Sequence, residues 1–382
     1  MSQTFPEALY IHIPFCGTVC NYCDFAREIY SPSQATGYLG ALGNELRVRC
    51  AELSAAGLFA PRTIFIGGGT PSVLPLELWT ALLSNLRQYV DLTRVVEFTT
   101  EANPGSADSG LLEFLRAQGV NRISFGVQSF QPHLLKLLGR GHDASAARAV
   151  VQTARAAGFS HIALDLLHGV PTQTRDDLRR DLDEALALDV EHISAYGLTY
   201  EQGTPLARAV AAGVVAPLGP EAERDQYLDV IEHLEGAGMP QYEISNYARA
   251  QAQARHNLIY WRNEAYLGIG VAAASFIQFE RSVNLRTVEA YVRRANQTGH
   301  AVLEREILSA QARAREALVL ELRLRRGIAP DEFLARWGLD PRTLPALEKF
   351  VNTGLVERTA EGRYRITRSG LPVADGILSE LV

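Results

Sequence analysis

The sequence lacks several features, and each absence argues against one class of protein. It contains no run of about 18 apolar residues, so no segment is expected to cross a bilayer. Its first residues include neither a basic stretch nor a long apolar one, so no signal peptide is expected. The net charge of −6 provides no overall field that would attract nucleic acid or an anionic membrane. These absences predict a cytoplasmic protein, in which thiols stay reduced.

Cysteine is also scarce, but three of the four cysteines lie in one short segment. Cys16, Cys20 and Cys23 follow an apolar run. Thiolates are soft ligands that favour iron-sulfur clusters, zinc or copper. A structural zinc site needs four ligands, and the only other cysteine is Cys50. Three cysteines can hold a 4Fe-4S cluster and leave one iron open. The alternatives are a zinc site completed by His12 or a distant histidine, and three unrelated core cysteines.

Short apolar or β-branched runs alternate with longer helical patterns over most of the chain. Strands are expected at 8–13, 63–66, 95–101, 122–127, 161–167 and 192–198, with a weaker candidate at 242–246. Helices are expected at 34–57, 76–90, 107–118, 131–138, 144–157, 174–188 and 219–237. This order predicts an α/β protein with a parallel sheet, closed or partly closed into a barrel. Chemistry then collects in the loops at the C-terminal ends of the strands, and the cysteine segment follows the first strand.

Two expected strands end in segments suited to ligand binding. The GGGTPS segment at 67–72 can bring backbone close to a ligand and expose N–H groups to an anionic or zwitterionic one. A tight turn would need glycine as well. Strand alternation places Glu97, Thr99 and Glu101 on one face. Acidic side chains inside a barrel need a partner, which could be a cationic ligand such as an ammonium or sulfonium, or an arginine from the next unit.

Three further polar residues lie near strand ends. Gln128 and Asp165 end the fourth and fifth strands, and Arg140 precedes a helix. A guanidinium can bind a carboxylate through two hydrogen bonds, and an aspartate at a strand end suits ribose hydroxyls. Each residue could equally form a local salt bridge or a helix cap. Together they are suited to one ligand that carries a carboxylate, an amine and a ribose.

The CxxxCxxC spacing, followed by Asp24 and Phe25, resembles the radical S-adenosylmethionine (SAM) superfamily. The segments YIHIPFC, GGGTPS, EANPG, NRISFGVQSF, LGRGH and HISAYGLTYEQGTP are similar to the HemN branch of oxygen-independent coproporphyrinogen III dehydrogenases and relatives, over essentially the whole chain. The resemblance implies a partial (β/α)6-type barrel in which Cys16, Cys20 and Cys23 bind a 4Fe-4S cluster. The cluster would donate one electron to SAM, giving methionine and a 5'-deoxyadenosyl radical. The implied SAM contacts are Tyr10, Tyr22, Gly68, Gly69, Thr70, Glu101, Gln128, Arg140, Asp165 and Thr199.

Two features separate the members of this branch. The dehydrogenases have an additional cysteine two positions after the third cluster ligand, where this chain has Phe25. The segments YEISNYA at 242–248 and RHNLIYW at 255–261 resemble the HemW family of haem chaperones. That resemblance implies haem binding by the HNxxYW motif, with the residues His256, Asn257, Tyr260 and Trp261. A buried His-Asn pair that braces the end of the barrel is the alternative.

A glycine-containing segment at 268–275 departs from the family pattern. HemW sequences commonly have histidine where this chain has Ala274, so any role of that imidazole is in doubt. The same segment matches GxGxxA, a pattern of dinucleotide-binding loops. No strand-loop-helix unit with an acidic residue about 20 positions later surrounds it, so dinucleotide binding is not expected.

The character of the chain changes near residue 308. Helical patterns at 308–322, 330–336 and 343–352 precede a short hairpin signal, and together they resemble a winged helix, a small α+β domain. The expected divisions are a core barrel at 1–240, an extension with the HNxxYW motif at 241–307, and a HemN-type C-terminal domain at 308–382. Because acidic residues are interspersed with the basic ones, a protein-contact or substrate-covering role is favoured over nucleic-acid binding.

The sequence therefore predicts a HemW-like radical SAM protein that carries haem as cargo. The expected partners are haem, a haem-accepting membrane protein such as a respiratory subunit, and a small electron donor such as a flavodoxin or ferredoxin. A peripheral position at the membrane is compatible with this function. The alternative within the family is oxidative decarboxylation of coproporphyrinogen III in porphyrin biosynthesis. A zinc-stabilised regulator that uses the winged domain is a third hypothesis.

Overall fold

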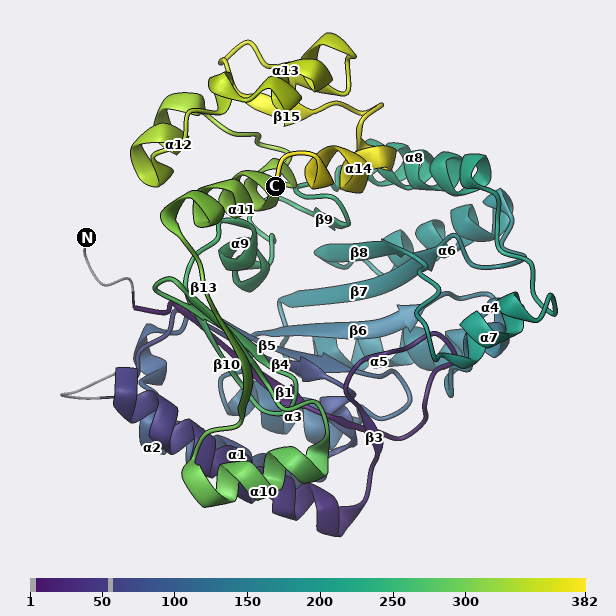
Figure 1. The fold of residues 1–382 in the computed structure, drawn as a ribbon. Coiled ribbons are helices and arrows are strands. Elements are labelled where there is room, and N and C mark those ends of the chain that lie inside the picture. Colours follow the sequence, from purple (N-terminus) through teal and green to yellow (C-terminus); the bar gives the residue numbers. More distant parts are fainter. Residues whose placement is uncertain (1–4, 54–57) are drawn as a thin grey trace.

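The structure is a computed structural model that describes residues 5–53 and 58–382. Two parts of the sequence predictions lie outside these residues: positions 54–57 of the helix expected at 34–57, and residues 1–4, on which the expectation of no signal peptide partly rests. The centre of the structure is an eleven-stranded sheet in the order β13-β12-β11-β10-β1-β4-β5-β6-β7-β8-β9. Six strands of this sheet, β1 and β4 to β8, are parallel and curve into a partial barrel (Figure 1). Their bounds are β1 Ala8–Ile13, β4 Thr63–Gly68, β5 Glu97–Ala102, β6 Arg122–Gln128, β7 His161–His168 and β8 His192–Gly197.

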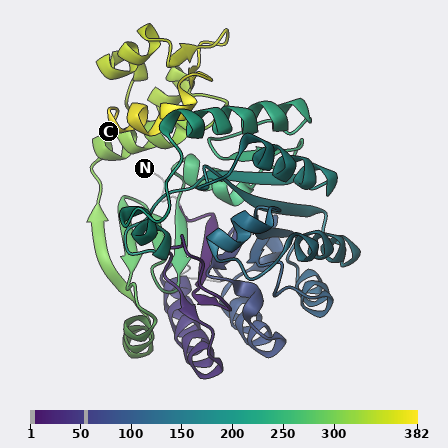
Figure 2. The ribbon, with the colours of Figure 1, turned by 90° about the vertical axis from the view of Figure 1, so that its right-hand side faces the viewer.

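Helices cover the outer side of the curved sheet, as Figures 1 and 2 show. They are α1 Pro32–Leu53, α2 Leu76–Tyr89, α3 Ser109–Ala117, α5 Ala144–Ala156, α6 Arg175–Ala187 and α8 Pro220–Gly236. Two short helices, α4 Pro132–Leu138 and α7 Pro205–Ala211, lie instead beside the cysteine loop (Figure 1), where Asn21 bonds the backbone of both. Four of these eight helices begin after a residue suited to the helix N-terminus: Asp108, Asp143, Thr174 and Thr204 each accept a hydrogen bond from a first-turn N–H. The expected βα order is confirmed, with most boundaries shifted by only one or two residues.

Strand alternation divides the two faces of the barrel by polarity. In β6, Ile123, Phe125 and Val127 are fully buried beneath the outer helices. The alternate positions Arg122 and Gln128 belong to the inner face, where they line a cavity. Barrels of this type usually fill their interior with branched apolar side chains. Here the inner face is polar, so the barrel has space and hydrogen-bonding groups for a ligand.

An extension adds strands to both edges of the barrel. Its elements are β9 Asn246–Ala248, α9 Arg255–Trp261, β10 Tyr266–Ile269, β11 Ala274–Ile277, β12 Glu280–Asn284, α10 Val288–Thr298 and β13 Val302–Ile307. Strand β10 pairs in parallel with β1, while β9 is antiparallel to β8. The strand expected at 242–246 is wrong, because the regular strand begins only at Asn246. The segment resembling a dinucleotide loop connects β10 to the antiparallel β11, so no helix follows it.

The C-terminal part consists of short helices and a hairpin. The elements are α11 Ala310–Leu322, α12 Pro330–Trp337, α13 Pro345–Asn352, β14 Val356–Arg358, β15 Tyr364–Ile366 and α14 Ala374–Ser379. The three helices and the β14-β15 hairpin have the winged-helix-like arrangement that the sequence predicts, and they lie above α9 and β9 in Figure 1. The divisions at 1–240, 241–307 and 308–382 stay a prediction. None of the described helices is long and apolar enough to cross a membrane.

Candidate functional site

The cysteine segment is a loop at the C-terminal end of β1. Strand β2 Phe15–Cys16 pairs in parallel with β3 Glu28–Ile29, which closes the loop at its base. Tyr30 N donates to Cys16 O at 2.9 Å, and Thr70 Oγ1 lies 3.4 Å from Cys16 Sγ. The loop is therefore held on the sheet by β2 and by the glycine segment after β4. All three thiols reach the same cavity.

Two arginines lie beside these thiols. Arg140 Nη1 lies 3.1 Å from Cys20 Sγ, and Arg27 donates to the carbonyl oxygen of Cys23. Burial raises the pKa of Cys16 and of Cys23, so in the free chain these thiols favour the protonated form. The positive charge of a bound metal reverses this preference. The guanidinium groups supply additional positive charge next to ligands that must be anionic when they bind iron.

The zinc alternative fits the geometry poorly. Zn–S bonds of about 2.3 Å require four ligand atoms close together. The described residues contain no group of three or more His, Cys, Asp or Glu side chains placed to hold a single metal ion. His12, the suggested fourth ligand, has both ring nitrogens engaged, Nδ1 with Tyr10 Oη at 3.0 Å and Nε2 with Ala26 O at 2.8 Å. A 4Fe-4S cluster spreads its sulfur ligands over a larger distance and remains compatible with this loop.

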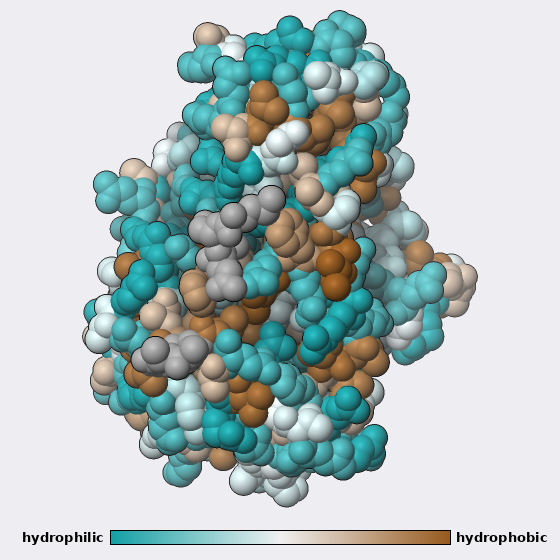
Figure 3. Space-filling model, turned by 60° about the vertical axis from the view of Figure 1, so that its left-hand side comes forward, coloured by the Kyte–Doolittle hydropathy of each residue, from teal (hydrophilic) through white to brown (hydrophobic). Residues whose placement is uncertain are grey.

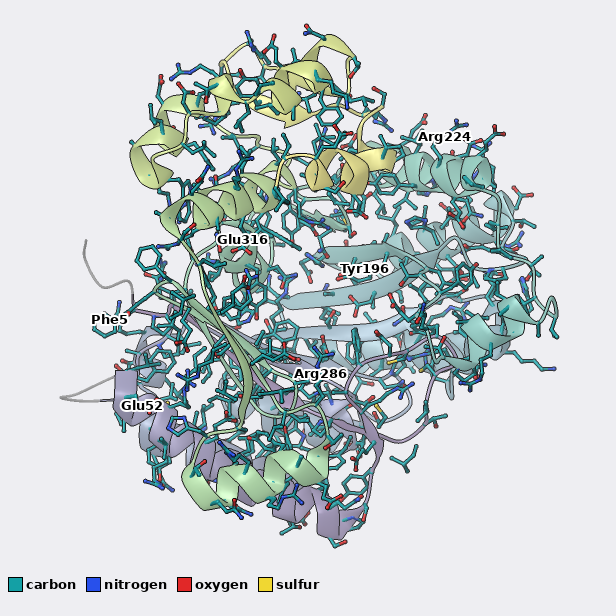
Figure 4. The ribbon with its side chains drawn as sticks, in the orientation of Figure 1. Phe5, Glu52, Tyr196, Arg224, Arg286 and Glu316 are labelled. Atoms are coloured by element: carbon teal, nitrogen blue, oxygen red, sulfur yellow. The ribbon has the colours of Figure 1, made fainter. Side chains whose placement is uncertain are left out.

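A cavity of about 570 Å³ extends from the cysteine loop into the barrel. Tyr196 projects from β8 into the space that the sheet encloses (Figure 4). Nine of the ten residues that resemblance assigns to SAM line this cavity: Tyr22, Gly68, Gly69, Thr70, Glu101, Gln128, Arg140, Asp165 and Thr199. Tyr10 is the exception, and its hydroxyl instead bonds His12. The structure thus brings together residues from six strands or the loops that follow them, while their roles stay a prediction.

The glycine segment after β4 differs from expectation in one respect. The N–H groups of Gly69 and Thr70 donate to Ile13 O and Phe15 O at 2.8 Å, and Gly68 N donates to Glu101 Oε2 at 2.9 Å. These N–H groups are therefore not exposed to a ligand. A Cβ on Gly69 would lie 2.8 to 2.9 Å from backbone atoms of residues 13–15, so glycine is needed for close packing.

Two acidic side chains, Glu101 and Asp165, line the cavity. Burial and the charge of Asp165 raise the pKa of Glu101 to about 7. Burial also raises the pKa of Asp165, against hydrogen bonds from Ser194 and Ser124. A cationic ligand between them would stabilise both carboxylates. Gln128, at the end of β6, has a φ of 71°, a strained conformation for a residue other than glycine. Such strain persists where surrounding structure enforces it, often at ligand sites.

The HNxxYW motif lies at the opposite end of the barrel from the cysteines. Its helix α9 begins at the carboxylate of Glu97, which accepts hydrogen bonds from Arg255 N at 2.9 Å and His256 N at 2.8 Å. Glu97 is the first residue of β5, so the helix N-terminus is held at the N-terminal edge of the sheet. The sequence left an arginine or a cationic ligand as partners for Glu97. The actual partner is the backbone of a helix 158 residues away.

His256 is closed to ligands in this arrangement. It is 1% exposed, and its Nδ1 and Nε2 lie 2.8 Å from Thr63 Oγ1 and Tyr260 Oη. Burial lowers the pKa of His256 to about 3, so the ring is neutral. Asn257 is the motif residue that lines the cavity. Trp261 lies outside it, where the Arg323 guanidinium stacks 4.7 Å from the ring centroid.

Sequence reasoning missed several residues of the site. Arg27, Arg122, His192 and Tyr196 all line the cavity, yet none was singled out for a role there. The signal for the last three was available, because they occupy inward positions of the strands β6 and β8. The sequence analysis applied strand alternation only to β5, where it placed Glu97, Thr99 and Glu101 on one face.

Known proteins with similar sequences place the chain in a family. The model of the Radical SAM superfamily matches residues 10–185, and that of the HemN C-terminal domain matches residues 308–373. "Heme chaperone HemW" of Bacillus subtilis is 34% identical, with 95% of this chain and 96% of the relative covered. The HemW proteins of Mycobacterium tuberculosis H37Rv and Escherichia coli K12 are 37% and 34% identical, covering 99% and 96% of this chain and 95% of each relative.

The chain belongs to the HemW family of radical SAM proteins. Among solved structures, the coproporphyrinogen III oxidase HemN of Escherichia coli has the same fold, with a TM-score of 0.84 and 23% identity over 99% of this chain and 90% of that chain. Membership in the superfamily implies a 4Fe-4S cluster and SAM. The residues present fit both groups. Three thiols border one cavity, with positive charge at Cys20 and two carboxylates beyond it.

Proposed function

We propose that this chain is a haem chaperone, which binds haem and transfers it to a haem-accepting protein of the respiratory membrane. The observation that carries the proposal is its identity of 34 to 37% with the named HemW proteins over nearly their full length. Phe25, where the dehydrogenases have their additional cysteine, supports the same conclusion. It is 64% exposed and borders the cavity, so a cysteine there would be accessible to substrate.

The cluster and SAM would occupy the end of the cavity that the cysteine loop borders. Cys16, Cys20 and Cys23 would bind three irons, and the fourth would take the amino and carboxylate groups of SAM. When bound, the cluster can supply an electron to SAM, and a small flavodoxin or ferredoxin is proposed as the donor of that electron. Glu101 and Asp165 would face the positive part of SAM, while the buried outer face of β6 keeps Gln128 fixed at its rim.

The HNxxYW motif is proposed to contribute to haem binding in two different ways. Asn257 faces the cavity and could contact the cargo directly. His256 lies on α9 and bonds Thr63 at the start of β4, so its contribution would come from positioning this helix. For His256 to ligate iron instead, it would have to give up the hydrogen bond at one ring nitrogen and emerge from a buried site.

Haem titration of the anaerobically reconstituted protein tests the function. We expect the wild type to bind haem in about one equivalent and to produce no protoporphyrinogen from coproporphyrinogen III and SAM. Porphyrinogen turnover at enzymatic rates would overturn the proposal in favour of the dehydrogenase, the alternative function. Failure to bind haem would also overturn it.

The same titration separates the two roles of His256. In a positioning role, His256→Ala weakens haem binding and leaves the Soret band of the remaining complex unchanged. In an axial role, the Soret band shifts because the iron loses a ligand. His233→Ala is the matched control, since His233 pairs with Asp183 on the outer helices.

Location follows from the proposed acceptor. A chaperone that delivers haem to a membrane subunit would work in the cytoplasm and contact the membrane surface transiently. Fractionation of cells with and without the acceptor subunit tests this, and we expect the membrane-bound share to fall when the acceptor is absent.

A further inference from the structure

The cavity has a second end, which the cluster and SAM do not explain. It extends down the barrel to Thr99 on β5, Arg122 on β6 and His192 on β8. Arg122 begins β6 and Gln128 ends it, so at about 3.3 Å per residue their Cα atoms lie roughly 20 Å apart. The inner end is therefore remote from the loops that gather the cysteines.

Arg122 is a buried cation whose charge acts on Asp165 but which forms no direct ion pair with a described residue. It is 4% exposed, and its Nη1 donates to Ala252 O at 2.9 Å. Its Nη2 has no hydrogen-bond partner. Within the described residues, no carboxylate lies within the 4.0 Å that defines an ion pair with Arg122. Glu97, which begins the neighbouring strand β5, is engaged by the N-terminus of α9. Removing a charge from water without pairing it is costly, so this position is suited to an anion.

Two further groups at the inner end have unused hydrogen-bonding capacity. His192 Nε2 lies 3.0 Å from Tyr242 Oη, and that oxygen accepts from Ala254 N at 3.3 Å. Because Tyr242 Oη accepts from Ala254 N, its own hydroxyl proton is free to be donated to His192 Nε2. The neutral imidazole then carries its proton on Nδ1. Among the residues that the structure describes, neither His192 Nδ1 nor Thr99 Oγ1 has a partner, and both residues are at most 2% exposed. The cavity end thus offers N–H and O–H donors from the strands β5, β6 and β8.

We propose that Arg122, His192 and Thr99 form a binding site for the carboxylate of a small organic molecule other than SAM. The guanidinium would carry the charge interaction, and the imidazole N–H and the hydroxyl would orient the carboxylate. Glu101 and Asp165 belong to the same cavity. Their negative charge disfavours a dianion more than a monoanion, which argues for a monocarboxylate over phosphate. The proposal goes beyond the chaperone function, because it is argued only from the residues at the inner end of the cavity.

Equilibrium dialysis of labelled propionate against the full-length, cluster-loaded chain tests the site. We expect saturable binding to the wild type and binding at least tenfold weaker to Arg122→Gln. Arg249→Gln is the control, because Arg249 pairs with Asp189 outside the cavity, and it should bind propionate like the wild type. His192→Phe should weaken binding about threefold or more, and it carries the test if Arg122→Gln does not fold.

Competition on the wild type gives a further measurement that needs no variant. Saturating SAM should leave propionate binding intact, because the two ligands would occupy different ends of the cavity. Displacement of propionate by SAM would overturn the proposal, since the anion would then occupy the SAM site. Tighter binding of inorganic phosphate than of propionate, or equal binding by Arg122→Gln and the wild type, would overturn it as well.

Discussion

At the scale of single residues, burial changes the protonation of Glu101, a carboxyl that lines the cavity. It accepts a hydrogen bond from Gly68 N, yet burial and Asp165 raise its pKa from 4.5 to about 7. Such a carboxyl holds its proton in the folded chain at a pH where the unfolded chain has lost it. Its contribution to stability is therefore complete below pH 4.5 and is lost as the pH rises through 7.

Glu101→Gln should remove this pH dependence. A shift of this size corresponds to about 3 kcal/mol at most. The free energy of unfolding of the wild type, measured with denaturant on the cluster-free chain, should fall relative to the variant between pH 5 and pH 8. Glu113→Gln, at an exposed position of α3, should follow the wild type. Parallel pH curves for wild type and Glu101→Gln would contradict the assignment.

At the scale of elements, α9 depends on contacts that are distant in sequence. Its seven residues are too few to form a stable helix alone. The carboxylate of Glu97 satisfies two N–H groups of its first turn, where negative charge also stabilises the helix dipole. Thr63, the first residue of β4, bonds the ring of His256 from 193 residues away. The helix is thereby fixed at the barrel's N-terminal end, with Asn257 at the cavity.

Glu97→Ala should destabilise the protein by about 3 kcal/mol, because the buried N–H of His256 and the partly buried N–H of Arg255 would lose their acceptor, and an unsatisfied buried group costs about 1 to 3 kcal/mol. Chemical denaturation measures the loss. Glu113→Ala removes a carboxylate from an exposed helix position and should change stability by less than about 0.5 kcal/mol. If both variants lose the same stability, the cap is not what holds α9.

At the scale of the whole molecule, the barrel and the C-terminal part share one hydrophobic core. The buried apolar cluster runs from Leu9 to Leu381 without interruption in space. Arg281 of β12 pairs with Glu316 of α11, and Figure 4 shows Glu316 on the side of α11 that faces the barrel extension. On the face shown in Figure 3, hydrophilic residues surround the separate hydrophobic patches. The C-terminal helices therefore belong to the same packed body as the barrel.

Differential scanning calorimetry should accordingly give one unfolding transition for the cluster-free chain. A shared core makes the two parts unfold together. Removal of residues 308–382 would expose the apolar residues that α11 covers, and the shortened chain should aggregate or unfold at a markedly lower temperature. Two separate transitions in the full-length chain would show that the parts are energetically independent.

The sequence by itself determined the alternation of strands and helices and the position of the cysteine loop. Hydrophobic periodicity is a local property, and the carboxyl ends of parallel strands necessarily meet at one edge. Nine of ten expected SAM residues reach one cavity for this reason. Only the tertiary structure decided that Glu97 caps α9, that His256 is enclosed and that Arg122 forms no direct ion pair with a described residue. These depend on which side chains meet across a curved sheet, and contacts between residues more than a hundred positions apart leave no periodic trace in sequence.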